Sequence, residues 1–214
     1  MAPPVAPPTL SAWLSAVPLA RKTPFYYLGQ LSDGEFTPSD PDAARWTKLK
    51  VARALELGAG RQAKWSASIG ARLDEIDLVA SDYDPPVCRC AQCVAADHTR
   101  LGELAASQAP FDLIFGSHVL CTCRWIAAPL RFLGQGTSTA GITCGGVSIE
   151  PDAVSDFVAA VRSLLRPEGG VAVFDQEGGW PFGLEALLRQ AAHKHGLHLY
   201  VRRGPLWTKC AATN

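Results

Sequence analysis

The sequence predicts an α/β protein with a doubly wound, mostly parallel sheet and a C-terminal antiparallel hairpin strand. Short apolar segments alternate with helix-like segments for five rounds, and the first apolar segment ends in a glycine-rich turn. Alternation of this kind requires parallel strands joined by right-handed crossovers. The last two apolar segments, 197–203 and 206–210, are separated only by Gly204 and Pro205, so we expect them to form a hairpin.

Each element of this pattern has its own signal. Residues 111–117 are continuous in apolar side chains, as expected for a strand covered on both faces. Residues 150–166 carry apolar side chains on one stripe, with Pro151 in the first turn and Pro167 after the end, which predicts an amphipathic helix. The other expected strands are 50–57, 76–82, 93–99 and 169–175, and the other expected helices are 62–73, 100–107 and 182–195.

The chain divides into an arm and one domain. Residues 1–38 form a Pro- and Ala-rich arm that contains no Asp or Glu before Asp33. This loosely resembles an organelle-targeting leader, but arginine is sparse, and we favour a disordered arm with a short helix near residues 10–16. Residues 39–214 form the domain. Within it, the Gly- and Thr-rich residues 134–146 show no periodicity and predict a loop or a flexible insertion.

Composition excludes several classes of partner. Lys and Arg number 20 and Asp and Glu number 20, so no global field attracts nucleic acid or anionic lipid. No apolar run approaches the roughly 20 residues that a bilayer span requires, so we expect no membrane insertion. The seven cysteines are an odd number, and the close set of Cys88, Cys90 and Cys93 suits a reducing compartment. We therefore expect a cytoplasmic protein.

The first apolar segment ends in Glu56-Leu-Gly58-Ala-Gly60, where a strand is expected to turn directly into a helix. In an open α/β sheet this turn approaches the ligand most closely, and glycine lets the backbone touch it. With Ala63, the glycines match the G-x-G-x-x-G/A pattern of dinucleotide binding, and Asp82 lies where the ribose-binding acid of that pattern is expected. The carboxylate of Glu56 would instead repel a pyrophosphate and suits a cationic ligand.

Four further motifs follow in order: Asp82 at the end of the second strand, Asp97 in AADHTRL, the phrase FDLIFGSHVL in the fourth strand, and LLRPEGG before the fifth. Together with the acid-x-Gly-x-Gly turn, they resemble the class I S-adenosylmethionine-dependent methyltransferases, which have a Rossmann-like, seven-stranded fold. The resemblance covers residues 50–210, and the terminal hairpin of that family suits the C-terminus. Gln62 stands where the family has a third glycine, so the path of the turn departs from the family pattern there.

The resemblance implies S-adenosyl-L-methionine as the cofactor. The two glycines would line its methionine and ribose portion, and Asp82 would accept hydrogen bonds from the ribose hydroxyls, with Tyr83 beside the adenine. Asp97 would hold the adenine amino group, and the backbone of His98 would meet the ring. The implied cofactor-binding residues are Glu56, Gly58, Ala59, Gly60, Asp82, Tyr83, Asp97, His98 and Ser117.

Methyl transfer from a sulfonium needs alignment more than it needs a base, because the methyl group is already activated. A base is required where the acceptor must lose a proton. His118 directly follows the fourth strand and has a side chain suited to that task, or it only lines the pocket. Tyr26 and Tyr27 are expected to fold over the cofactor as an N-terminal lid, or alternatively to pack the arm onto the sheet.

The spacing of the cysteines also raises the question of a metal site. Cys88, Cys90 and Cys93 have C-x-C-x2-C spacing, and Cys121 and Cys123 follow the fourth strand. A structural zinc usually takes four ligands, so three clustered thiols are an incomplete set unless one of the later pair comes near. We predict no metal and interpret these cysteines as small buried side chains or as thiols without a role.

The sequence therefore predicts a methyltransferase that acts on a small molecule. The fourth strand has no N-P-P-Y-like signature, and the basic residues form no stripe of the kind that a nucleic-acid substrate favours. A protein (lysine-type) methyltransferase remains an alternative, so a protein substrate stays open. From other classes, an NAD(P)-dependent oxidoreductase and a non-catalytic nucleotide-binding module also remain open.

Overall fold

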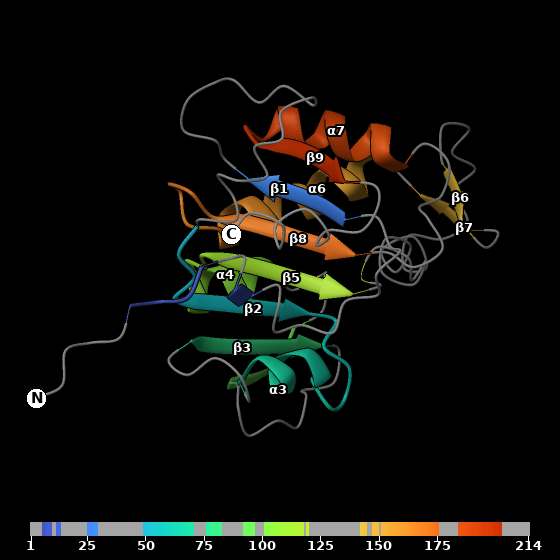
Figure 1. The fold of residues 1–214 in the computed structure, drawn as a ribbon. Helices are drawn as coiled ribbons and strands as arrows, with labels where there is room; N and C mark the ends of the chain where they lie inside the picture. Colours follow the sequence, from blue (N-terminus) through green and yellow to red (C-terminus); the bar gives the residue numbers. More distant parts are fainter. Residues whose placement is uncertain are drawn as a thin grey trace, which may run out of the picture.

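The chain folds around a single seven-stranded sheet (Figure 1). The computed structural model describes residues 6–9, 12–13, 25–29, 49–70, 76–82, 92–96, 101–117, 119, 142–144, 147–149, 151–175 and 184–202. The strands lie in the order β4-β3-β2-β5-β8-β1-β9. Their bounds are β1 Phe25–Gly29, β2 Arg53–Leu57, β3 Asp77–Asp82, β4 Gln92–Ala95, β5 Leu113–Ser117, β8 Val171–Asp175 and β9 His198–Arg202.

Five of these strands, β4, β3, β2, β5 and β8, run parallel to one another. The arrowheads of β3, β2, β5 and β8 point to the same side in Figure 1. The chain moves from β2 outward to β3 and β4, and then returns to place β5 and β8 on the other side of β2. The order of the strands therefore reverses between β2 and β5, and the doubly wound, mostly parallel sheet predicted from the sequence is confirmed.

In the described part of the sheet, the strand that runs antiparallel to its neighbours comes from the N-terminal arm. β1 lies between β8 and β9 and pairs antiparallel with both along its whole length. The sequence assigned an antiparallel position to a C-terminal hairpin strand and did not expect a strand from the arm in the sheet. Residues 206–210, the expected second arm of the hairpin, lie outside the described residues. Segments that are close in sequence are expected to pair, but strand pairing does not require the strands to be close in sequence. A distant segment can therefore occupy the position between β8 and β9.

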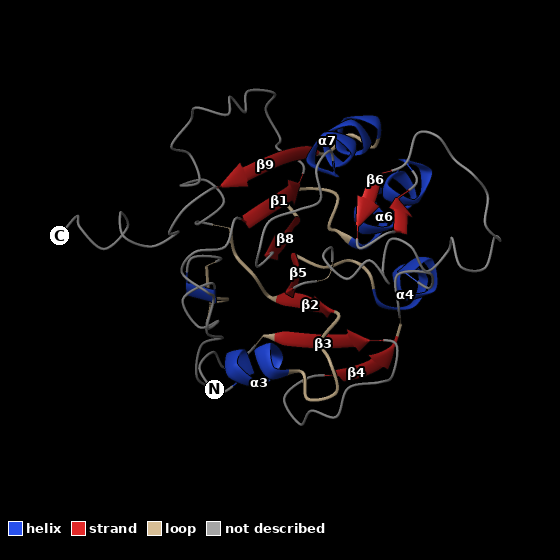
Figure 2. Cartoon of the chain, turned by 90° about the vertical axis from the view of Figure 1, so that its right-hand side faces the viewer, coloured by secondary structure: helices blue, strands red, loops and turns tan. Residues whose placement is uncertain are grey.

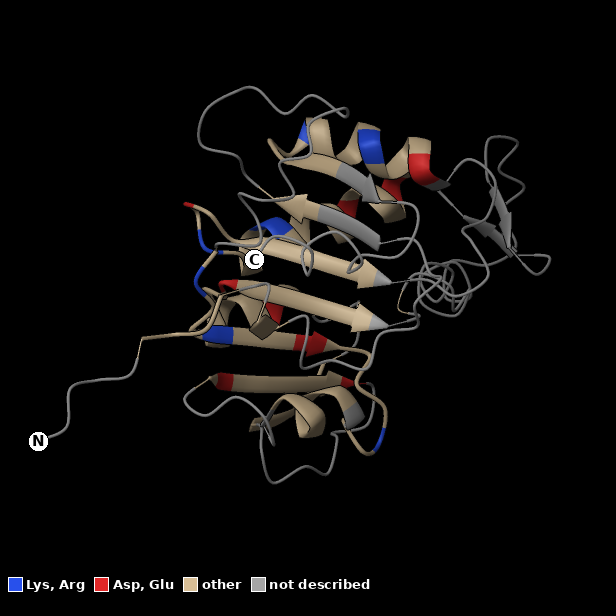
Figure 3. Cartoon of the chain, viewed as in Figure 1, with Lys and Arg blue, Asp and Glu red and all other residues tan. Residues whose placement is uncertain are grey.

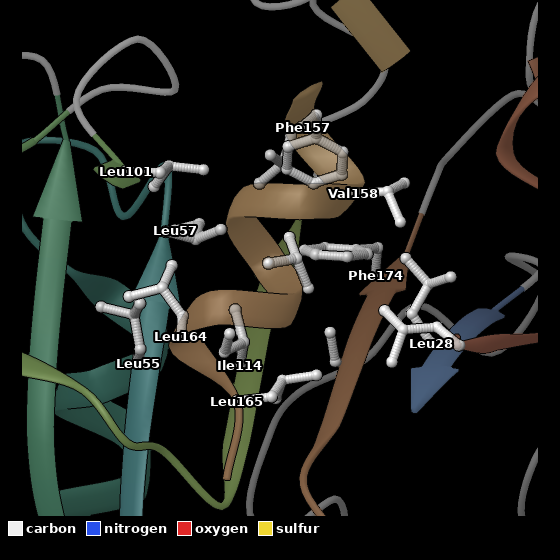
Figure 4. Close-up of a cluster of buried hydrophobic side chains, with 14 of the residues drawn as sticks. Leu28, Leu55, Leu57, Leu101, Ile114, Phe157, Val158, Leu164, Leu165 and Phe174 are labelled. Carbon is white, nitrogen blue, oxygen red and sulfur yellow. The ribbon is translucent and has the colours of Figure 1, made fainter. Parts of the chain in front are cut away.

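Helices cover both faces of the sheet (Figure 2). α3 (Lys64–Gly70) lies on one face, and α4 (Leu101–Gln108), α6 (Pro151–Leu164) and α7 (Leu184–Lys194) lie on the other. The amphipathic stripe predicted for 150–166 becomes the buried face of α6. Figure 4 shows its core: Leu55, Leu57, Ile114 and Phe174 from the strands meet Phe157, Val158 and Leu164 from α6.

Parts of the arm pack against the domain on the α3 face. The Pro8 carbonyl accepts a hydrogen bond from the Val51 N–H at 2.9 Å. Trp13 is 1% exposed, and its ring meets Phe115 edge-on with 4.5 Å between centroids. Trp65 of α3 also stacks on Phe115, with 6.3 Å between the ring centroids. The arm therefore supplies both a strand of the sheet and an aromatic side chain that covers it.

A small two-stranded sheet precedes α6. β6 (Ile142–Cys144) and β7 (Val147–Ile149) form an antiparallel hairpin. The loop predicted for residues 134–146 is therefore wrong over 142–144. Strands this short leave almost no periodicity to detect in the sequence. Among the described residues, no helix has both the length and the apolar character needed to cross a membrane.

Candidate functional site

The candidate site lies at the carboxyl ends of β2, β3 and β5. In open α/β sheets, ligands bind outside this edge, where the strand order reverses. β2 ends at Leu57, the chain turns through residues 58–63, and α3 begins at Lys64. Of the sequence-predicted set, the structure brings together at this edge Glu56, Gly58, Ala59, Gly60, Asp82 and Ser117.

The turn requires its glycines. Gly58 and Gly60 adopt left-handed φ angles of +63° and +65°, which residues other than glycine rarely adopt. Ala63, the last residue before α3, also has a positive φ of +42° and is fully buried. The backbone therefore makes a tight, left-handed path between β2 and α3, and the small side chain at 63 lets the helix start close to the sheet.

Glu56 is a buried carboxylate that bonds the start of α3. It is 5% exposed, and its Oε2 atom accepts hydrogen bonds from both the N–H and the hydroxyl of Ser66, with 2.9 Å to the nitrogen. Burial raises the pKa of Glu56 from 4.5 to about 7, the bonds from Ser66 and the Trp65 N–H oppose this rise, and the nearby Asp82 charge adds to it. Glu56 is thus close to its titration midpoint at neutral pH.

Asp82 ties the glycine turn to β3. Its Oδ2 atom accepts a hydrogen bond of 2.7 Å from the Gly60 N–H. The neighbouring Ser81 adds two links: its carbonyl accepts from the Ala59 N–H at 3.0 Å, and its hydroxyl donates to the Glu56 carbonyl at 3.0 Å. Glu56 and Asp82, two of the carboxylates that the sequence singled out, therefore also hold the turn in place. Charge-assisted bonds of this kind are the stronger class, so the turn is ordered before any ligand arrives.

Val119, two residues after β5, packs against the glycine turn. Val119 is buried, and a Cβ placed on Gly58 would lie 3.2 Å from its Cγ2 atom. A Cβ placed on Gly116 would lie 2.3 Å from the same atom and 2.9 Å from the Leu57 carbonyl oxygen. Gly116 is therefore required so that β5, the end of β2 and Val119 can pack together. Both residues lie in the phrase FDLIFGSHVL, but the sequence assigned neither a role, because what approaches a glycine in a strand depends on tertiary packing.

We expect Gly116→Ala to destabilise the protein by about 1–3 kcal/mol, because the added methyl group must displace Val119 or the backbone of Leu57. Gly102→Ala is the matched control. A Cβ at Gly102 meets nothing within 4 Å, and alanine favours the helix α4 in which this residue lies. Urea unfolding of both variants measures the difference. Equal stability of the two variants would contradict the packing described for Gly116.

Several predicted residues lie outside the described part of the chain. These are Tyr83, Asp97, His98 and His118. Ala96, which directly precedes Asp97, is described, and its N–H donates to the Asp82 carbonyl at 3.0 Å. The chain therefore leaves β4 beside the end of β3.

Tyr26 and Tyr27 lie in β1, in the interior of the sheet. Tyr26 is paired with Phe174 and Val201, and Tyr27 with Val173 and Tyr200. The expectation that this segment folds over the cofactor as a lid is wrong, because backbone paired on both edges belongs to the sheet itself. The alternative that these residues attach the arm to the sheet agrees with this position.

Of the clustered cysteines, the structure describes Cys93, which lies half-buried in β4 with a reduced thiol. Cys88, Cys90, Cys121 and Cys123 lie outside the described residues. Within the described ranges, no group of three or more His, Cys, Asp or Glu side chains is arranged to hold a metal ion.

Comparison with models of known protein families found no match, and neither curated proteins nor solved structures gave one. The site is therefore interpreted from its own geometry. Its defining features are a left-handed glycine turn at the reversal of strand order and a carboxylate on each side of that turn.

Proposed function

We propose that the protein is an S-adenosylmethionine-dependent methyltransferase that acts on a small molecule. The observation that carries this proposal is the pair of carboxylates, Glu56 and Asp82, on either side of the Gly58–Gly60 turn at the point where the strand order reverses. A ligand at this edge would meet the bare backbone of the two glycines and the partly exposed Asp82 carboxylate, with the Glu56 carboxylate buried beneath the surface. A nucleoside with a cationic sulfur and two vicinal hydroxyl donors suits such surroundings.

Methyl transfer from a sulfonium requires few further groups from the protein. A sulfonium carries its own leaving group, so rate acceleration comes mainly from holding acceptor, methyl carbon and sulfur in line. The ordered turn supports this role, because a rigid wall costs less to organise when the ligand binds. His118 follows β5 in the sequence and remains the proposed base for an acceptor that must lose a proton.

A dinucleotide is the second candidate, and one observation favours it. Ala63 is fully buried at the sixth position of the G-x-G-x-x-G/A pattern, where a small side chain is needed for close helix-to-strand packing. Two observations weigh against it. The Gly60 N–H donates to Asp82 and is already engaged, and Glu56 adds a second carboxylate beside the same turn. A pyrophosphate would meet repulsion there.

A small acceptor is favoured over a nucleic acid. In the described parts of the chain, Lys and Arg are scattered among Asp and Glu and form no stripe along one face (Figure 3). Nucleic-acid substrates favour such a stripe, because neutralising phosphates supplies most of the affinity. A protein substrate remains the alternative acceptor.

Thermal unfolding with S-adenosylhomocysteine and, separately, with NAD⁺ or NADP⁺ tests this proposal. Ligand at a hundred times its dissociation constant stabilises the fold by about 2.7 kcal/mol, which corresponds to a rise in Tm of about 5–10 °C for a chain of this size. We expect the rise with S-adenosylhomocysteine alone. Asp82→Ala should remove it. A rise with the dinucleotides and none with S-adenosylhomocysteine would replace the proposal by the second candidate.

A further inference from the structure

Ser66 carries a buried hydroxyl group, and no motif in the sequence assigns it a role in the site. It is fully buried on α3, and both its N–H and its hydroxyl donate to the same oxygen, Oε2, of Glu56. Glu56 lies ten residues earlier, on β2, so this contact closes the glycine turn. A carboxylate that accepts two donors on one oxygen is fixed in direction as well as in position.

We propose that Ser66 is a positioning residue that sets the affinity of the site for cationic over neutral ligands, by holding the Glu56 carboxylate in place. The proposal rests on the function proposed above and specifies how that site distinguishes a sulfonium from a thioether. S-adenosylmethionine and S-adenosylhomocysteine share the nucleoside and the amino acid. They differ in the methyl group and the positive charge on sulfur, so their affinity ratio reports mainly the charge preference of the site.

The surroundings of Glu56 make this preference depend on pH. Its pKa is raised to about 7, with burial the largest cause. Ser66 and the Trp65 N–H, both on α3, stabilise the ionised form, whereas Asp82 on β3 disfavours it. Phe115 on β5 pairs beside Glu56 and carries no charge. In the described part of the chain, Asp82 is the charged group whose field acts on Glu56.

The direction of this pH dependence follows from the linkage between proton binding to Glu56 and ligand binding. A cation stabilises the ionised carboxylate, so the pKa of Glu56 is lower in the complex than in the free protein. The additional affinity for the cation is then complete above the free-protein pKa of about 7 and is lost as the pH falls through it. Between pH 8 and pH 6, the preference for S-adenosylmethionine over S-adenosylhomocysteine should fall by about tenfold.

The experiment is calorimetric titration of both ligands at pH 6, 7 and 8 with four proteins. These are the wild type, Ser66→Ala, Glu56→Gln and the double variant. In Ser66→Ala the lost hydroxyl bond makes the carboxylate harder to ionise, so the fall in preference should move to higher pH by about one unit. In Glu56→Gln the preference should no longer change with pH, and adding Ser66→Ala to that background should change nothing further. Ser163→Ala is a fifth protein, the control, and should behave as the wild type, because this exposed hydroxyl on α6 donates to the Ala160 carbonyl of its own helix.

Each outcome supports or overturns the proposal. A pH-independent preference in the wild type overturns it even where both ligands bind, and so does an equal effect of Ser66→Ala in the wild-type and the Glu56→Gln backgrounds. Failure of either ligand to bind at any pH overturns the proposed function and this inference with it. If Ser66→Ala does not fold, Ser66→Cys takes its place, because a thiol is a weaker donor at the same position. Its fall in preference should also move to higher pH, and an unchanged pH profile overturns the proposal.

Discussion

Deletion of residues 1–29 is expected to abolish cooperative folding of the chain. β1 supplies the backbone partner of both β8 and β9, with five paired positions on each side. Without it, two strands lose hydrogen-bond partners in the interior of a sheet, and the fully buried Leu28 and Trp13 are lost from their contacts. Unpaired buried backbone groups are costly, and the net stability of a domain is only about 5–15 kcal/mol.

Circular dichroism during thermal and urea unfolding measures this effect against the full chain. Gly102→Ala, where an added Cβ meets nothing within 4 Å, is the control and should unfold as cooperatively as the full chain. A truncated chain that begins at residue 30 and still unfolds in one sharp transition at the original midpoint would show that β1 does not hold the sheet together.

Asp112→Ala is expected to destabilise the protein by about 2 kcal/mol, because it leaves two part-buried backbone donors without their acceptor. Asp112 is 6% exposed and lies just before β5, at the amino edge of the sheet. Its Oδ2 atom accepts hydrogen bonds of 2.9 Å from the N–H groups of Ala52 and Arg53, and its Oδ1 atom accepts one of 2.6 Å from Arg166 Nε. One carboxylate thus joins the starts of β2 and β5 to the end of α6.

Arg166→Ala provides the matched comparison. The Arg166 side chain is half-exposed, so its removal leaves Asp112 with both backbone donors and costs about 1 kcal/mol or less. Urea unfolding of the two variants measures the difference. Equal losses would mean that the ion pair, and not the backbone bonds, carries the contribution of Asp112. The candidate site is at the opposite edge, so ligand binding by folded Asp112→Ala should be unchanged.

The parallel strands could be predicted because each is a short apolar run with its own boundary signals. Residues 111–117 are apolar throughout most of their length, and β5 is buried, with the rings of Trp13 and Trp65 against Phe115. The helix α6 was predicted from its apolar stripe and its two flanking prolines, to within one residue at its start and two at its end. The glycine turn was predictable for the same reason, since few residues other than glycine adopt the left-handed angles found at 58 and 60.

Long-range partners had no such local signal. The pairing of β1 with β8 and β9 joins segments more than 140 residues apart. The local sequence of Phe25–Gly29 does not distinguish between a lid, an arm and a strand. Ser66 and Asp112 are single polar residues whose importance depends on what burial places beside them. Glu56 was correctly singled out as a carboxylate at the end of a strand, but its bond to Ser66 exists only once α3 packs on the sheet.

Local sequence was enough to establish the five parallel strands, their common direction and the glycine turn between β2 and α3. These follow from periodicity, from the right-handed crossover and from the conformational freedom of glycine, which all act over a few neighbouring residues or one crossover. Three features emerged only in the folded chain: the N-terminal strand completes the sheet, Ser66 holds Glu56, and Asp112 joins three elements. Such choices depend on competition among distant segments for the same buried donors and acceptors, and that competition is resolved only when the chain is compact.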